Sequence, residues 1–466
     1  MTEKKKIRLI GTKAFYKTVF TITIPIMIQN LITSFVSLLD NIMVGQVGTE
    51  AMSGVAIANQ LMFVFNLAIF GALSGIGIFT AQFFGAEDEE GVRHTFRAKW
   101  YVTLALLLLF TVLAIFKGES LIGLFLQAGD DPAAVALTLS QGMGYLRVML
   151  IGLLPFILSQ VYSSTMRESG ETRIPMIAGV VAVLVNLVFN YILIFGHFGA
   201  PALGVVGAAI ATVLARFVEM GINVTATHRG KERFSFIRGA YRSMHVPSGL
   251  VKRMLVRGTP LLLNEFLWSV AMSAVQQSYS TRGLTAVAAI NISSTVSNLF
   301  SQGYFAMGSA VAIIVGQLLG AGKFEEAKET DYQLITFTFG LGLALGIIAT
   351  VLAPLFPQLY NTSEEVRSLA TQLLRLTAYF MPVISVVHCC YFTMRSGGKT
   401  VVTFFFDSFY MMVLVYPVSF ILSRYTGMNM QQLYLCLSSL DILKAIVGLV
   451  LVGKGVWINN LVKDVS

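Results

Sequence analysis

A carboxylate, Asp40, follows the first long apolar run of this 466-residue chain, a run that extends from Thr18 to Leu39. If that run crosses a membrane, a charge at its end costs about 2.5–3.5 kcal/mol, so a functional role is the default expectation. Such a carboxyl group can exchange a proton, or hold a sodium ion through oxygen ligands. The alternative is that Asp40 caps the end of the run in interfacial water.

Two asparagines are candidate neighbours of this acid. Asn186 and Asn190 are four residues apart in an apolar run near 175–195, so they share one face of a helix. Their amides can stabilise either protonation state of a carboxyl group. Asparagine pairs also tie membrane helices together without any further role, and that alternative stays open.

The second half of the chain carries acids of its own. Glu265 lies in the stretch GTPLLLNEFLWSV. Asp407 lies in TFFFDSFYMMVL and is a candidate for substrate binding or coupling. His388 could titrate near neutral pH and take part in coupling, or simply be packed. Asp441 and Lys444 are three apart, and we expect them to pair with each other.

The composition indicates the environment of these residues. Hydrophobic residues make up 55% of the chain and charged residues only 12%, whereas soluble domains carry about 25% charged residues. The net charge of +9 does not indicate a nucleic-acid partner, because the basic residues cluster in short segments between apolar runs. The chain is therefore predicted to be an integral membrane protein.

Apolar runs long enough to cross the bilayer as helices occur twelve times, which predicts an all-α fold. Alternate connecting segments hold twenty-five lysines and arginines on one side of the membrane and four on the other. This imbalance predicts that both termini are cytoplasmic. The predicted spans lie near 18–39, 51–83, 98–116, 135–163, 175–195, 203–227, 254–279, 286–319, 332–354, 366–393, 401–422 and 431–452.

The two halves of the chain repeat each other. Pro25 matches Pro260, and QFFGA at 82–86 matches QLLGA at 317–321, both at an offset of 235 residues. Six spans per half give the halves the same orientation, an arrangement typical of secondary transporters. We expect a six-helix lobe at 1–227, a basic cytoplasmic linker at 228–253 and a second six-helix lobe at 254–466.

The acids break this repeat. The position equivalent to Asp40 is Val275, and the position equivalent to Glu265 is Asn30. Neither acid is therefore required by the scaffold that the two halves share.

Longer motifs resemble the multidrug and toxic compound extrusion (MATE) family over nearly the whole chain. They are PIMIQNLITSFVSLLDNIMVGQVGTEAMSGVAIANQ, AQFFGAED, TMRESGETRIPM and the closing GKGVWINN. The resemblance implies two six-helix bundles in the plasma membrane. It also implies export of organic cations and amphipathic drugs, in exchange for entering H+ or Na+. The expected partners are these small molecules and membrane lipids, with no cofactor, no nucleic acid and a monomeric state.

The resemblance also implies site residues. The family's N-lobe cation site matches Asp40, Asn186, Asn190 and a helix-six hydroxyl at Thr212, and its C-lobe acid matches Glu265. No acid lies within the tenth predicted span, where several sodium-coupled members have one, and Asn190 stands where some members carry a second acid. These departures favour protons as the coupling ion and leave sodium open.

Two other functions remain as alternatives. A lipid-linked saccharide flippase shares the broad architecture and is expected to show basic residues in a central cavity. Arg147, Arg216 and Arg375 are the only arginines well inside spans, and the first and last are repeat equivalents, which favours a scaffold role. An enzyme would need a reactive constellation, yet SGGKT at 396–400 lacks the earlier glycine of a phosphate loop. We therefore expect a transporter and not an enzyme.

Overall fold

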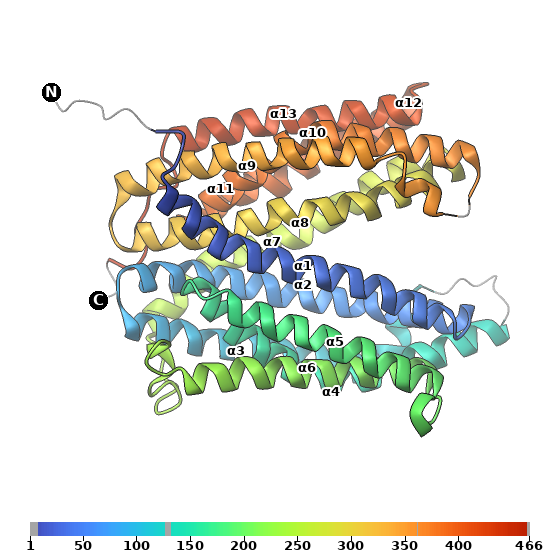
Figure 1. The fold of residues 1–466 in the computed structure, drawn as a ribbon, viewed down its shortest axis with the longest axis horizontal. Helices are drawn as coiled ribbons and strands as arrows, with labels where there is room; N and C mark the ends of the chain where they lie inside the picture. Colours follow the sequence, from blue (N-terminus) through green and yellow to red (C-terminus); the bar gives the residue numbers. More distant parts are fainter. Residues whose placement is uncertain (1–7, 126–131, 361, 464–466) are drawn as a thin grey trace. The chain divides into compact units, whose positions relative to one another are not determined.

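The computed structural model describes residues 8–125, 132–360 and 362–463, and in these residues it contains helices and turns but no strand (Figure 1). The all-α prediction is thus confirmed. Twelve long helices follow one another along the chain, since α11, two π-helical turns and α12 run on as one. The helices are α1 Lys13–Gly45, α2 Thr49–Gly85, α3 Glu89–Gly123, α4 Pro132–Glu168, α5 Arg173–Phe195, α6 Gly204–Arg229, α7 Ser248–Ser280, α8 Leu284–Gly320, α9 Phe324–Leu352, α10 Glu364–Ser396, α11 Thr400–Phe404, η4 Phe405–Phe409, η5 Met411–Val415, α12 Tyr416–Tyr425 and α13 Met430–Gly453.

Eleven helices of the described residues are long and apolar enough to cross a membrane. The exception is α7, whose first turns carry Lys252, Arg253 and Arg257 and whose middle carries Asn264 and Glu265. Those polar residues lower the hydropathy of α7 without shortening it. The number of long helices therefore agrees with the twelve predicted spans.

The chain divides into two compact units. The N-lobe unit comprises Ile28–Thr80 and Glu89–Val251, and the C-lobe unit comprises Met1–Met27, Ala81–Asp88 and Lys252–Ser466. Two short stretches from the first hundred residues thus group with the second half of the chain. The lobe boundaries expected from the repeat stay a prediction.

Small residues bring the helices of the N-lobe unit together. α6 packs along both α4 and α5, and α3 packs along α4 (Figure 1). Gly207 of α6 lies against the backbone of Leu193 in α5, and Gly152 of α4 lies against Val213 of α6. Close approach of this kind is how helices associate in lipid, where no hydrophobic force drives them together.

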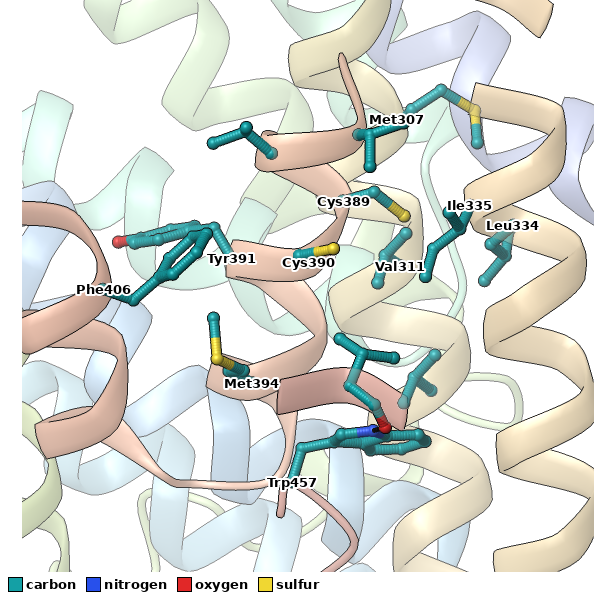
Figure 2. Close-up of a cluster of buried hydrophobic side chains, with 14 of the residues drawn as sticks. Met307, Val311, Leu334, Ile335, Cys389, Cys390, Tyr391, Met394, Phe406 and Trp457 are labelled. Carbon is teal, nitrogen blue, oxygen red and sulfur yellow. Dashed lines mark hydrogen bonds between the residues drawn. The ribbon is translucent and has the colours of Figure 1, made fainter. Parts of the chain in front are cut away.

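In the C-lobe unit α10 is the central helix and packs against α8, α9 and α13. Cys389 and Cys390 are free thiols buried in this core, as expected of structural cysteines, while Cys436 is only partly buried. Figure 2 shows the two thiols among apolar side chains from neighbouring elements. The labelled residues around them are Met307, Val311, Leu334, Ile335, Tyr391, Met394, Phe406 and Trp457.

The repeated Gln-x-x-Gly-Ala motif makes a reciprocal contact within the C-lobe unit. A Cβ atom at Gly85 would collide with the backbone of Gln317, and one at Gly320 would collide with the backbone of Gln82. The ends of α2 and α8 therefore touch backbone to backbone at equivalent positions. Only glycine allows this approach, which explains the residue type at both places.

The segment after α13 folds back onto these helix ends, and we call residues 457–461 the C-terminal clasp. The Gln82 side chain donates to the carbonyl oxygen of Ser396 at 3.0 Å and accepts from the backbone amide of Leu461 at 2.7 Å. Asn460 donates to the carbonyl oxygen of Gly320 at 3.0 Å, and Trp457 is fully buried. The clasp thus satisfies backbone groups at helix ends that would otherwise lack partners.

Candidate functional site

The predicted N-lobe residues lie together. Asp40 is on the second half of α1, and the Asn190 amide of α5 donates to one of its oxygens at 2.5 Å. Asn186 lies one turn away on the same face of α5. In the orientation that satisfies its neighbours, its nitrogen donates to both Asp40 oxygens at 3.0 Å, and its oxygen accepts from the Thr212 hydroxyl of α6 at 3.1 Å. Three helices thus converge on one carboxylate.

Asp40 has no cation beside it. No ion pair of the described residues includes this side chain. Its neighbours are neutral amides and a hydroxyl, and Asn186 and Asn190 are only 6% and 1% exposed. The negative charge is therefore stabilised by hydrogen bonds alone, in surroundings that favour its neutralisation.

One amide in this group is incompletely satisfied. The side-chain oxygen of Asn190 is buried and has no hydrogen-bond partner. A buried acceptor without a donor costs about 1–3 kcal/mol, so a proton donor or a cation arriving here would relieve that cost.

Two members of the N-lobe cluster were missed by the sequence analysis. The Tyr145 hydroxyl of α4 donates to Asn59 of α2 at 3.2 Å and also interacts with Thr212 and Asp40. A tyrosine in an apolar helix gives a weak signal, because its ring packs like any other aromatic residue.

The C-lobe acids form a different arrangement. Glu265 on α7 accepts from the Tyr391 hydroxyl of α10 at 3.1 Å, and Arg395 of α10 lies 3.8 Å from the same oxygen. The Asn264 amide donates to the Tyr391 oxygen at 3.3 Å and to Asp407 at 3.0 Å. The two acids are therefore linked through Asn264 and Tyr391.

Asp407 lies in η4, a π-helical turn, and Lys444 of α13 donates to its second oxygen at 2.6 Å. Lys444 thus makes its close ion pair with Asp407 and acts on Asp441 only electrostatically, from further away, so the direct pair predicted from sequence does not form. Asp441 and Lys444 are three residues apart on α13, but Asp407 of η4 lies closer to the lysine than Asp441 does. We call Glu265, Arg395, Asp407 and Lys444, with Asn264 and Tyr391 between them, the C-lobe network.

The C-lobe network is electrically balanced. Each carboxylate has one cation, and the side chains of Arg395 and Lys444 are only 5% and 6% exposed. Such pairs need no further ion to compensate their charge.

His388 lies near the C-lobe network without bonding to it. One ring nitrogen is 3.1 Å from the backbone oxygen of Ile384, and the ring packs against Tyr304 and Phe305. These contacts favour the packed alternative over a coupling role.

Comparisons with known proteins place this geometry in context. A family model described as MatE matches residues 25–192 and 260–421. A probable multidrug resistance protein NorM of Thermotoga maritima is 25% identical over 417 residues, 88% of this chain and 86% of that protein. A multidrug resistance protein MdtK of Pectobacterium atrosepticum is 26% identical over 364 residues, 77% of each chain.

Solved structures agree in fold. A crystal structure of MATE in complex with MaL6 matches with a TM-score of 0.84 at 21% identity, covering 96% of this chain and 97% of that one. The outward-facing conformation of a multidrug resistance MATE family transporter of the MOP superfamily also matches with a TM-score of 0.84, at 20% identity, covering 98% and 99%.

Proposed function

This chain belongs to the MatE family of multi-pass membrane transporters, and we propose that it is a proton-coupled antiporter that exports organic cations and amphipathic drugs. Relatives of this chain are named multidrug resistance proteins, and these names support the proposed substrate class. Asp40 supplies the coupling group in this proposal. The protein acts in the plasma membrane as a monomer, without a cofactor.

The observation that carries the proposal is the lack of a counter-charge at Asp40. A carboxylate that is bonded only by neutral donors changes its net charge when a proton binds, and the surroundings must respond. The C-lobe network has no such deficit, because a lysine or an arginine already neutralises each acid. Asp331 of α9 is also fully buried, with a neutral donor, Thr393, and no ion pair among the described residues. The proposal places coupling at Asp40 because polar side chains from α5 and α6 gather around it.

The donor geometry favours a proton over sodium. The Asn190 amide nitrogen donates to the carboxylate, so at this position the site offers a donor where Na+ would need an oxygen ligand. A proton on Asp40 converts it into a donor. A half-turn of the Asn190 amide then lets its unpartnered oxygen accept from the carboxyl O–H.

This exchange weakens the tie between α1 and α5. Hydrogen bonds to an ionised carboxylate are roughly twice as strong as neutral ones, so protonation replaces strong bonds with weaker ones. Pro25 already removes one backbone bond from α1. The proton drives export only if one conformation binds it more tightly, and the Asn190 contact is the one that we propose differs between the conformations.

The test is Asp40→Asn, which fixes a neutral side chain of the same shape. In proteoliposomes with an imposed proton gradient, this variant should lose driven export of a cationic dye while remaining folded. The same assay is repeated with a sodium gradient in place of the proton gradient. Full proton-driven export by the variant would show that Asp40 is an interfacial cap. Export by the parent protein that follows only the sodium gradient would show that sodium, and not the proton, is the coupling ion.

The flippase alternative predicts a different result. An accessible cluster of cations is required to hold a pyrophosphate. Arg216, however, lies over the ring of Phe156 at 4.6 Å and reaches the Gly152 carbonyl oxygen at 3.5 Å, which is a packed position. Transfer of a lipid-linked saccharide without any dye export would support that alternative.

A further inference from the structure

A row of polar side chains runs along α6 away from the Asp40 site. After Thr212 come Arg216, Glu219, Asn223 and Thr227, at intervals of three or four residues that place them on one face of the helix. From first to last they cover about 22 Å at 1.5 Å per residue. Polar residues at membrane depth are costly, so a row of five requires a reason.

The matching face of α4 also carries polar contacts. Tyr145, Gly152, Ser159 and Met166 follow one another at intervals of seven residues. Arg216 reaches the Gly152 carbonyl oxygen at 3.5 Å, Asn223 donates to the Ser159 hydroxyl at 2.9 Å, and Thr227 donates to the Met166 sulfur at 3.5 Å. We call the contact between these two faces the α4–α6 seam.

The α4–α6 seam is buried yet not fully satisfied. Ser159, Asn223 and Thr227 are each 0% exposed. The side-chain oxygen of Asn223 nevertheless has no hydrogen-bond partner. Buried acceptors in native proteins are almost always paired, so this oxygen is available to accept a hydrogen bond from a proton donor that enters the seam.

Glu219 is the titratable group of the seam, one turn from Asn223. It interacts with the Ser159 hydroxyl and with two cations, Arg216 on its own helix and Arg167 at the end of α4. Arg167 in turn donates to Gln29 of α1 at 2.7 Å. Arginines do not release protons in proteins, and Glu168 at the end of α4 is paired with Lys99, so Glu219 is the carboxylate left to accept a proton that moves along the seam.

The direction of the α4–α6 seam suits release of a proton into the cytoplasm. α6 ends at Arg229 and is followed by the basic linker, which the distribution of lysine and arginine assigns to the cytoplasmic side. Glu219 lies seven residues from Thr212, about 10 Å further towards that end. The seam therefore connects the Asp40 cluster with the side on which an antiporter must release its coupling ion.

We propose that the α4–α6 seam is the inward branch of the proton path, with Glu219 as the carboxylate that receives the proton from Asp40. The Asp40 O–H bond breaks, water in the seam carries the proton, and an O–H bond forms on Glu219. Glu219 then gives the proton to cytoplasmic water, and Asp40 is again a carboxylate. This inference rests on the proposed proton coupling.

The experiment compares Glu219→Gln with Glu232→Gln, which makes the same chemical change at an exposed position of the linker. Three properties are measured in purified protein: dye binding, dye exchange without net proton flux, and export driven by a proton gradient. Glu219→Gln should keep binding and exchange while driven export falls by about a hundredfold, the scale of a lost proton-transfer group. Glu232→Gln should match the parent.

Two further variants test the inference even if Glu219→Gln fails to fold. Glu219→Asp should keep part of the driven export with a displaced pH profile. Asn223→Leu should remove this buried acceptor and slow driven export while exchange persists. Driven export by Glu219→Gln at the parental rate and pH profile would overturn the inference and leave the proposed function standing. Loss of binding and exchange together would make Glu219 a structural group, and absence of proton-driven export in the parent would refute the proposed function itself.

Discussion

At Asp407 a lysine supplies the charge that Asp40 lacks, and this difference separates the tasks of the two acids. Asn264 satisfies one oxygen of Asp407 and Lys444 the other, so the side chain is held in a single arrangement. Asp40 has amide donors alone and can exchange its charge. At the scale of single residues, the partner of an acid therefore decides whether it holds structure or moves protons.

Lys444→Met should reveal the structural role of that pair. Removing one partner leaves an uncompensated, partly buried charge, so unfolding free energy in detergent should fall by about 3 kcal/mol. Adding Asp407→Asn to the Lys444→Met variant should restore most of the lost unfolding free energy. The control is Lys323→Met, since Lys323 pairs with Glu326 where both side chains are more than half exposed, and such pairs contribute about 0–1 kcal/mol. A Lys444→Met variant as stable as the parent would contradict the structural role of the Lys444–Asp407 pair.

At the scale of helices, the repeated Gln-x-x-Gly-Ala motif lies where two backbones meet. The equivalence of Gly85 and Gly320 was visible in the sequence, and the reciprocal contact of α2 with α8 gives its physical reason. A methyl group at either place would push the two helix ends apart. Glycine is thus needed at these positions because it lets the ends of α2 and α8 come close together. Its backbone conformation is not the reason.

Gly320→Ala should therefore destabilise the C-lobe unit, by at least the roughly 1–3 kcal/mol of overpacking. The matched control is Gly340→Ala in α9, where a Cβ atom would meet nothing within 4 Å. That change should be neutral or stabilise slightly, because alanine favours helix over glycine. Thermal unfolding of both variants in detergent measures the difference. Equal melting temperatures would show that the helix ends separate without cost.

The sequence predicted the helices well because apolar length and helical periodicity are local properties. The grouping of Asp40 with Asn186 and Asn190 was predictable from spacing together with family resemblance. The pairing of Lys444 with Asp407 was not, because it depends on how α13 meets the helix that follows α10. Glu219 was not singled out for the same reason: the row of polar residues on α6 gains its meaning only from the face of α4 that it packs against.

At the scale of the whole molecule, contacts do not follow chain order. The C-lobe unit contains Met1–Met27 and Ala81–Asp88 from the first hundred residues, and the C-terminal clasp holds Gln82 from the other end of the chain. Trp457 anchors the clasp, being fully buried beside α13 with its ring N–H donating to the Val452 carbonyl oxygen at 3.1 Å.

Trp457→Ala should accordingly cost about 3–5 kcal/mol of unfolding free energy, as expected for loss of a buried aromatic side chain. Trp268→Ala offers the control, because that side chain on α7 is 39% exposed. Denaturation in detergent, followed by the remaining tryptophan fluorescence, compares the two. A larger loss from the Trp268 change would show that the clasp contributes little.

The C-terminal clasp also sets an order of events during synthesis. Gln82 leaves the ribosome 379 residues ahead of Leu461, which binds it. The end of α2 therefore lacks this partner until Leu461 has emerged. Since domains otherwise fold as they emerge, ribosome-bound chains arrested before residue 457 should be open to proteolysis near residues 81–88, and chains in which residue 461 has left the ribosome should be protected there.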